Sequence, residues 1–504
     1  MSTSQSPRVA FFPPKPTGVP GLDTVLGGGL PTGDLVFIIG THGSGKTILA
    51  LQMAFARVRS GGKALLLTAF SESHDKLIAH LSSLDFFDAS MVGQQVQFLS
   101  ILSMLEAEVE ETTRNLVRTV RQQGIEMVII DGFRGIRSVL SSELAIRQFL
   151  QLLGTQLVYL GATLVITIEM DVDDSELYPE ITTGDTIIAL RRELMGRQHR
   201  RLIEIQKVRG QAPLSGTHRY TIDHAGLSVY PRLESLDVEP LPPVEAGRAA
   251  FDLPGLDRML DGGLTRSTAT LLGGTPGTGK TLLGLHYILA GVAAGEAGLF
   301  VTLGESEEQL VDKVASFSLD LRASIASGLL RIVRRPPVEL DVDELADTIR
   351  QDLLQRPVRR LVFDGLAPLQ YALDKEQRTQ DYFAAMIELL RLRQVTSLFV
   401  DEMAKLDGEA ADSTNTPFFH LSTNMLLLRQ VEFRSRMYRT ISIVKARFSD
   451  FDRTIREFVI GTRGIEVGEP LADAEGQLTG SGQSSPAREP GRGRTGRHSR
   501  GNQE

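Results

Sequence analysis

The chain has no cysteine among its 504 residues. This absence excludes disulfide bonds, a cysteine-ligated zinc site and a thiol nucleophile. No apolar run reaches the length of a membrane span, and the N-terminal segment MSTSQSPRVAFFPPKP lacks the basic start and apolar stretch of a secretory signal. We therefore expect a cytoplasmic protein without a membrane partner.

Positive charge is also in deficit, because 54 Lys and Arg stand against 62 Asp and Glu, giving a net charge of −8. This balance argues against nucleic acid as a partner, since proteins that bind it cluster cations on one surface. Hydrophobic residues make up 42% and charged residues 23%, a globular composition. The length exceeds what one core normally serves, so more than one domain is expected.

Two glycine-rich segments stand out, GTHGSGKT at 40–47 and GTPGTGKT at 274–281. Both fit the P-loop pattern G-x-x-x-x-G-K-[ST], in which backbone N–H groups and the lysine bind phosphates and the hydroxyl ligates magnesium. A glycine-rich turn can also be a simple loop, but two copies in matching contexts favour binding of ATP and Mg²⁺. The predicted nucleotide-binding residues are Gly40, Thr41, His42, Gly43, Ser44, Gly45, Lys46 and Thr47, and Gly274, Thr275, Pro276, Gly277, Thr278, Gly279, Lys280 and Thr281.

The chain repeats itself over the length of a domain. PGLDTVLGGGL at 20–30 returns as PGLDRMLDGGL at 254–264, and the two P-loop lysines are likewise 234 positions apart. A stretch with helical period and then an apolar run rich in strand formers follow each P-loop. Strand, P-loop, helix and strand in this order form the βαβ unit of a parallel sheet.

We therefore predict an α/β fold of two tandem P-loop domains, each a mainly parallel twisted sheet flanked by helices. The domains are expected at 15–232 and 249–468. A proline-rich acidic linker at 233–248 joins them, and 1–14 is a flexible N-terminus. Residues 469–504 are rich in Gly, Ser, Pro and Arg and are expected to be disordered.

An apolar run ending in one carboxylate follows in each half. MVIID ends at Asp131 and LVFD ends at Asp364. This Walker B pattern delivers a carboxylate to the C-terminal edge of the sheet, beside the P-loop hydroxyl. A strand ending in Asp is also common in turns, but its spacing from a P-loop favours a magnesium site. The expected metal ligands are Thr47, Asp131, Thr281 and Asp364.

These motifs together resemble the RecA-like ATPases, and their tandem arrangement resembles the KaiC family of circadian-clock ATPases. The similarity covers about residues 15–468 and includes RRLIEIQKVRG at 200–210 and RTISIVKARFSDFDRTIREFVI at 439–460. It implies two RecA-like domains and a double-ring homohexamer with ATP between neighbouring subunits. It also implies that a K-x-R pair of one subunit reaches the phosphates held by the next and stabilises phosphoryl transfer. Lys207 with Arg209, and Lys445 with Arg447, occupy those positions.

The sequence departs from this family where a catalytic base is expected. The family has two adjacent glutamates after the strand that follows the P-loop helix, and the first acts as the base. Here TAFSES at 68–73 and VTLGES at 301–306 place Ser71 and Gly304 first, and Glu72 and Glu305 second. Neither serine nor glycine can replace a carboxylate as a base. Glu72 and Glu305 are the remaining candidates, unless they are only acidic residues at a helix start. Lys46 and Lys280 complete the predicted catalytic set with the two K-x-R pairs.

A second departure concerns phosphorylation. The family phosphorylates a Ser-Thr pair in its second half, and an ungapped alignment places Phe419 and His420 there. Ser422 and Thr423 lie three residues further on, where a shifted loop would offer them. Serine/threonine autokinase activity therefore stays open.

Three functions follow from these patterns. The intact Lys, Thr and Asp set favours an ATPase, with or without autokinase activity, in signalling or timing. The missing glutamates favour a scaffold that ATP holds together and that recruits a signalling partner. A RecA- or RadA-like DNA repair ATPase ranks last, because GLAPLQYALDKEQ at 365–377 offers one lysine beside acids where a basic loop is needed.

Overall fold

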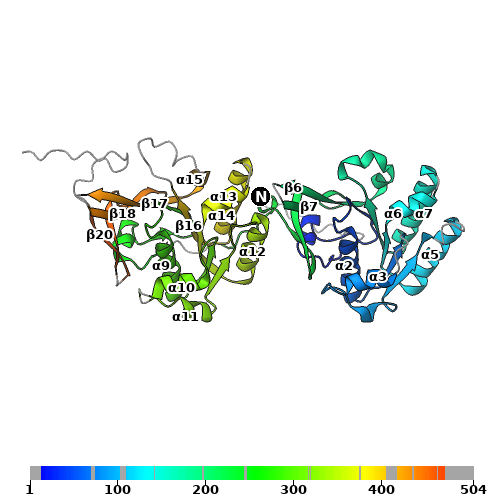
Figure 1. Cartoon of the computed structure of the whole chain (residues 1–504), viewed down its shortest axis with the longest axis horizontal. Helices are drawn as coiled ribbons and strands as arrows, with labels where there is room; N and C mark the ends of the chain where they lie inside the picture. Colours follow the sequence, from blue (N-terminus) through cyan, green and yellow to red (C-terminus); the bar gives the residue numbers. More distant parts are fainter. Residues whose placement is uncertain are drawn as a thin grey trace, which may run out of the picture. The chain divides into compact units, whose positions relative to one another are not determined.

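The computed structural model describes residues 13–69, 74–102, 109–140, 142–195, 198–242, 247–315, 317, 319–373, 376–403, 417–433, 436–461 and 464–470. The chain divides into two compact units, each built on its own large sheet (Figure 1). Ser71 and Glu72, from the first predicted base position, lie outside the described residues. Within the described part of the chain, no helix is both long and apolar enough to cross a membrane.

The first sheet has nine strands in the order β3-β2-β4-β5-β1-β6-β7-β8-β9. The first six in this order are parallel, and β7, β8 and β9 extend the sheet in antiparallel fashion. The strands are β1 (Leu35–Gly40), β2 (Ala64–Thr68), β3 (Val96–Ser100), β4 (Met127–Asp131), β5 (Thr163–Glu169), β6 (Thr186–Met195), β7 (Gln198–Val208), β8 (Thr217–Asp223) and β9 (Gly226–Tyr230).

The second sheet repeats this topology in the order β14-β13-β15-β16-β12-β17-β18-β19-β20. The predicted fold class, two tandem RecA-like α/β domains, is confirmed. The strands are β12 (Ala269–Gly274), β13 (Ala297–Thr302), β14 (Leu330–Arg334), β15 (Val358–Asp364), β16 (Thr396–Glu402), β17 (Asn424–Phe433), β18 (Arg436–Ala446), β19 (Arg456–Gly461) and β20 (Gly464–Pro470), with a separate pair β10 (Arg248–Ala249) and β11 (Leu264–Thr265).

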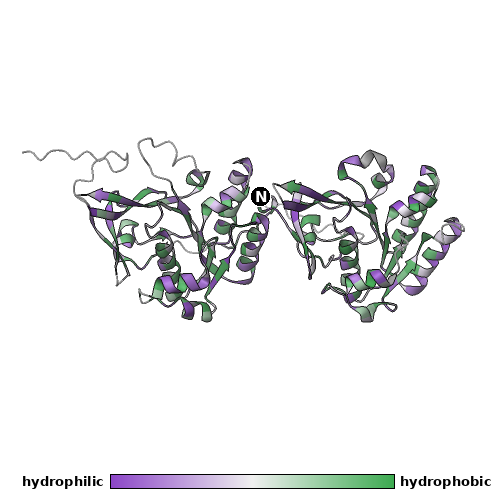
Figure 2. Cartoon of the chain, viewed as in Figure 1, coloured by the Kyte–Doolittle hydropathy of each residue, from purple (hydrophilic) through white to green (hydrophobic). Residues whose placement is uncertain are grey.

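Helices cover both faces of each sheet, because successive residues of a buried strand point to opposite sides. Phe37 of β1 belongs to the core beneath α5, α6 and α7, whereas Val36 belongs to the core beneath α1 and α2. Figure 2 shows apolar strands at the centre and hydrophilic residues on the outer faces of the helices. The helices are α1 (Leu22–Leu26), α2 (Lys46–Arg59), α3 (His74–Leu81), α5 (Val109–Gln123), α6 (Phe133–Val139), α7 (Glu143–Tyr159), α8 (Pro254–Met259), α9 (Lys280–Ala293), α10 (Glu307–Ala315), α11 (Leu321–Ala326), α12 (Val342–Gln355), α13 (Leu366–Leu373), α14 (Glu376–Leu392) and α15 (Pro417–Leu421).

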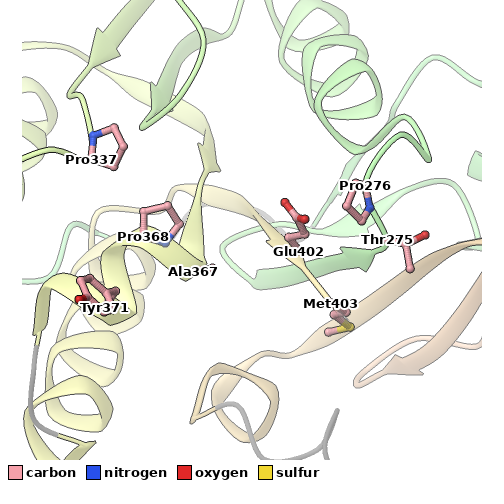
Figure 3. Close-up of a pocket in the computed structure, with 8 residues that line it drawn as sticks. All are labelled: Thr275, Pro276, Pro337, Ala367, Pro368, Tyr371, Glu402 and Met403. Carbon is pink, nitrogen blue, oxygen red and sulfur yellow. The ribbon is translucent and has the colours of Figure 1, made fainter. Parts of the chain in front are cut away.

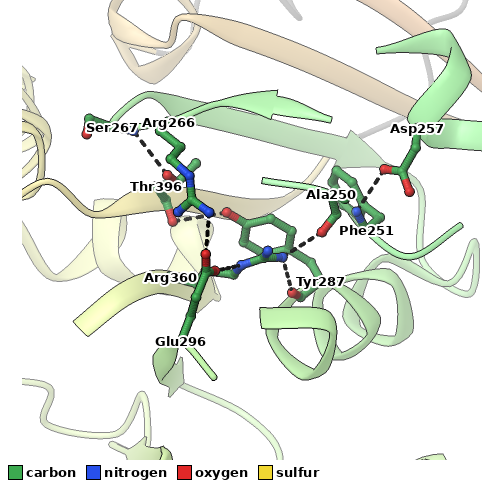
Figure 4. A network of polar contacts seen from close by, with 9 residues as sticks. All are labelled: Ala250, Phe251, Asp257, Arg266, Ser267, Tyr287, Glu296, Arg360 and Thr396. Carbon is green, nitrogen blue, oxygen red and sulfur yellow. Dashed lines mark hydrogen bonds and ion pairs between the residues drawn. The ribbon is translucent and has the colours of Figure 1, made fainter. Parts of the chain in front are cut away.

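An ionic network around the buried Arg360 lies near the N-terminal end of β15 in the second unit (Figure 4). Glu296 accepts hydrogen bonds from Arg266 and from the Nε of Arg360, the latter at 2.6 Å. The Arg360 guanidinium also donates to the carbonyl oxygens of Ala250 and Tyr287, at 2.6 and 2.9 Å. Burial acts to raise the pKa of Glu296, but the bonds from both arginines hold that pKa below its usual value. The network thus joins several segments through one carboxylate and one guanidinium.

The cost of breaking this network should depend on which partner is removed. The Arg360 side chain is 4% exposed, so Glu296→Gln leaves a buried cation unpaired and should cost about 3–5 kcal/mol of unfolding free energy. Arg360→Met installs the residue that the first repeat has at position 127, and should cost less because Arg266 still pairs with Glu296. The double variant should recover part of the loss. Hydrogen exchange of the β15 amides in increasing urea measures these differences, and equal losses in all three variants would contradict the expectation.

Candidate functional site

Each P-loop joins the C-terminal end of a parallel strand to the start of a helix, β1 to α2 and β12 to α9. The residue before each helix, Gly45 or Gly279, has a left-handed φ of 94° or 101°. A Cβ at these positions would lie 2.4 Å from the Ile222 side chain and 2.5 Å from that of Ile460. Only glycine satisfies both the backbone and the space. The free N–H groups at such a helix start form a phosphate site.

The P-loop lysines point into their own loops. Lys46 Nζ donates to the carbonyl oxygens of Gly40 and Thr41 at 3.0 and 2.9 Å, and Lys280 makes the same two bonds in its loop, each at 2.8 Å. Burial lowers the pKa of both lysines, against the opposing charges of nearby carboxylates. Within the described residues neither ammonium forms an ion pair, and a desolvated cation of this kind fits an anionic phosphate chain.

A hydroxyl and a carboxylate meet beside each P-loop. Thr47 Oγ1 donates to Asp131 at 3.0 Å, and Thr167 Oγ1 donates to the same carboxylate at 2.6 Å. Thr281 bonds to Asp364 in the second unit, and burial raises the pKa of both aspartates. No cluster of three or more His, Asp or Glu side chains in the described residues would hold a metal by itself. The chemistry of each pair instead fits Mg²⁺ held jointly with nucleotide phosphates and water.

Each P-loop lysine also has an acidic neighbour on the adjacent strand. The strand register places Glu169 beside the first residue of the first loop, and Glu402 beside the first residue of the second. The second site carries a further carboxylate, Asp401, whose pKa burial raises to about 6. Ile168 stands at the matching position of the first repeat, so the electrostatics of the two sites differ.

Glu305, the remaining candidate for the base of the second site, is engaged in an ion pair. Its backbone N–H donates to Thr302 Oγ1 at 3.2 Å, just after β13 ends. One carboxylate oxygen accepts from Lys313 of α10, and the other is buried with no partner among the described residues. Burial is the main cause of the raised pKa of Asp364, and the charge of Glu305 raises it further. Glu305 is therefore part of the second site, but it is held by a cation.

Sequence reasoning missed the hairpin that supports each P-loop. The Tyr220 hydroxyl, fully buried on β8, donates to the carbonyl oxygen of Ser44 at 2.5 Å. Ile222, two residues further on, lies against Gly45. The available signal was the return of YTIDHAG at 220–226 as FVIGTRG at 458–464. The second unit keeps the apolar contact, but its phenylalanine lacks the hydroxyl.

A cavity of about 770 Å³ opens beside the second P-loop (Figure 3). It lies between the start of that loop, the end of β16 and helix α13, and Glu402 is the one carboxylate among the described residues that line it. The first repeat has Arg134 where the lining has Ala367. The lining residues are Thr275, Pro276, Pro337, Ala367, Pro368, Tyr371, Glu402 and Met403. The second site thus has an apolar space next to its P-loop.

The K-x-R pair of the first unit lies near the start of β6. Lys207 Nζ donates to the carbonyl oxygens of Thr182 and Gly184 at 3.1 and 2.5 Å. Arg209 forms an ion pair with Asp185 at 3.0 Å, and its side chain is 63% exposed. Because β6 is parallel to β1, this position is at the opposite edge of the sheet from the P-loop. The two cations contact the same short segment.

The second unit repeats this placement with one difference. Lys445 Nζ donates to the carbonyl oxygens of Phe419 and Ser422, at 3.1 and 2.5 Å. Thr423 stands where the first unit has an aspartate. Arg447 is exposed, and none of the described carboxylates pairs with it.

Neither pair can reach the phosphates of its own domain. The backbone N–H of Arg209 bonds to Asp185, whose carboxylate accepts from the N–H of Leu35 at the start of β1. Gly40, where the P-loop begins, is five residues further along that strand, or about 16 Å at the usual rise. This exceeds the length of an arginine side chain. The second unit has the same geometry at the start of β12.

The hydroxyls considered as phosphate acceptors are poorly placed. Ser422 is fully buried, and its Oγ donates to the carbonyl oxygen of Phe419 at 3.1 Å. Thr423 is partly buried, and its backbone N–H bonds to the carbonyl oxygen of Ala269 at 2.8 Å. Phe419 and His420 themselves lie in the short helix α15. Phosphorylation of Ser422 would require this segment to rearrange.

The fold and the two sites define a tandem P-loop NTPase. The model of the KaiC ATPase family matches residues 15–234 and 251–472. Because these matches span most of the chain, the protein belongs to the KaiC family.

Relatives of known name resemble the chain over nearly its whole length. It is 28% identical to the circadian clock protein KaiC3 of Synechocystis sp. over 494 residues, which covers 92% of this chain and 94% of the relative. It is 26% identical to the circadian clock oscillator protein KaiC of Thermostichus vulcanus over 482 residues, covering 92% and 91%. It is also 24% identical to the circadian clock oscillator protein KaiC 1 of Synechocystis sp. over 485 residues, covering 92% and 91%.

Proposed function

We propose that the protein is an ATPase whose two P-loops each bind Mg-ATP, and whose sites are completed by the K-x-R pair of a neighbouring copy in a double-ring hexamer. The observation that carries the proposal is the edge placement of these pairs. Each pair lies too far from the P-loop of its own domain to contact a nucleotide bound there. In both units, however, backbone oxygens of the segment before β6 or β17 hold the lysine of the pair in the same position. The relatives are named as circadian clock proteins, which supports a role in timing. We propose that this role, or one in signalling, is exerted through a protein partner.

The chain's own groups divide the work in each site. Lys46 and Lys280 neutralise the outer phosphates, and the helix starts bind them through backbone N–H groups. Thr47 with Asp131, and Thr281 with Asp364, would hold Mg²⁺, which neutralises charge on the transferring phosphate. A neighbour's Arg209 or Arg447 would stabilise the charge that spreads over the phosphate oxygens.

We propose hydrolysis of ATP, and not autophosphorylation, as the main reaction of the protein. Ser422 is buried, and Phe419 and His420 carry no hydroxyl. Hydrolysis is expected to be slow, because Gly304 offers no carboxylate and Glu305 is bound to Lys313.

A second candidate is a scaffold in which bound ATP is structural and is not turned over. The ion pair of Glu305 favours it, since it removes the last carboxylate suited to act as the base of the second site. Both candidate proteins bind ATP, but only the ATPase hydrolyses it.

Incubation with γ-labelled ATP and magnesium separates these functions. We expect label to appear as free phosphate, to fall more in Lys46→Ala than in Lys280→Ala because the second site is the slower one, and to vanish in the double variant. Label on Ser422 or Thr423 would establish the autokinase. Tight ATP binding without free phosphate or labelled protein would contradict the ATPase and support the scaffold.

A further inference from the structure

Two charged side chains, Lys313 and Glu305, pair at the second site, and the charges of both act on Asp364. Lys313 of α10 donates to one oxygen of Glu305, and the charge of Lys313 also acts to lower the pKa of Asp364, against the larger raising effect of burial. The Glu305 and Lys313 side chains are 33% and 35% exposed, respectively. The ammonium therefore lies beside Glu305 at the rim of the site, where its charge also acts on Asp364, and not in the core.

This contact affects the transfer of a proton from the attacking water, a step for which the site lacks a dedicated base. In hydrolysis the oxygen of water bonds to the γ-phosphorus, the bond from that phosphorus to the ADP oxygen breaks, and one proton of the water passes to a base. A base must accept a hydrogen bond from that water. One oxygen of Glu305 is occupied by Lys313, and the other is buried.

We propose that Lys313 is a positioning residue that holds Glu305 in this ion pair and thereby keeps hydrolysis at the second site slow. The inference rests on the proposed ATPase function and adds a reason for a difference between the two halves. His80 occupies the matching position of the first repeat, on α3, and it is exposed. An imidazole is shorter than the side chain of a lysine, so the residue at this position differs in reach between the two halves.

The test uses the full chain with Lys46→Ala, which leaves the second site as the only one with its P-loop lysine. We expect Lys313→Met to raise kcat about two- to fivefold, the range for freeing one partner of a half-exposed ion pair, with little change in the KM for ATP. Lys313→Arg keeps the charge and should restore the slow rate. Lys313→His, which copies the first repeat, should act like Met at pH 8 and move towards the slow rate at pH 6.

The variant Lys313→Met combined with Glu305→Gln decides whether the effect passes through Glu305. The combined variant should lose the gain entirely. An unchanged or lower kcat in Lys313→Met, or a gain that survives Glu305→Gln, would overturn the role of Lys313. The starting protein reports separately on the ATPase itself: if it releases no phosphate that depends on Lys280, the proposed function fails with it.

Discussion

Replacing Gly304 by glutamate should raise phosphate release at the second site by about tenfold or more, since a positioned general base contributes about 10²- to 10⁴-fold. The structure has room for it. A Cβ built on Gly304 meets no atom within 4 Å, and its backbone is not in the left-handed region. Its N–H donates to Thr302 Oγ1 at 3.2 Å, so the turn after β13 is already fixed. Phosphate release by the Lys46→Ala protein, with and without this change, measures the gain.

Gly304→Gln is the matched control, because glutamine has the same size and cannot take a proton at neutral pH. It should leave the rate near that of the starting protein. An equal gain from glutamine would show that the added side chain acts by packing, and no gain from glutamate would show that the rate is limited elsewhere. Lys280→Ala should remove the activity in either background.

Removing the exposed arginine of the second pair should have the other large effect. Arg447→Ala is expected to lower the turnover of the second site about 100-fold, less than the 10³- to 10⁵-fold of an isolated arginine finger, because Lys445 remains. The change is best measured together with Gly304→Glu, where the starting rate is higher. Arg447 faces solvent and pairs with none of the described carboxylates, so its loss should leave the fold intact.

Arg447→Lys keeps the charge without the planar fork and should lose less activity than alanine. The first unit offers a comparison, since Arg209 is already paired with Asp185. Asp185→Thr copies the second unit and should free Arg209. If Arg447→Ala left the turnover of the second site unchanged, the sheet edge that carries Arg447 would not contribute to a nucleotide site.

The fold and the placement of the P-loop and Walker B residues could be predicted from the sequence, because these depend on short motifs with fixed spacing. The Walker B strands end at Asp131 and Asp364, and the structure brings each one to the P-loop hydroxyl of its own half. The parallel arrangement of the strands follows from the βαβ order. The sequence therefore also indicates that Glu169 and Glu402 lie at the same edge of the sheet as the P-loops.

Other features could not be predicted from the sequence, because they depend on packing between segments that are far apart in the chain. The hydroxyl of Tyr220 meets Ser44 across 176 positions, and no local pattern indicates such a contact. The pairing of Glu305 with Lys313 spans eight positions, but it requires the turn after β13 to be placed first. Glu296 lies just before β13 and Arg360 lies within β15, and no local pattern in the sequence indicates that these two residues pair.

Mixing two defective subunits tests the central claim most directly. Lys280→Ala removes the P-loop lysine and Arg447→Ala removes the cation of the other edge, both in the Lys46→Ala, Gly304→Glu background. If the site forms between copies, co-expressed subunits should regain activity at about a quarter of the second-half sites, where an intact P-loop meets an intact Arg447 of its neighbour. A mixture no more active than the mean of its two components would contradict a site shared between copies.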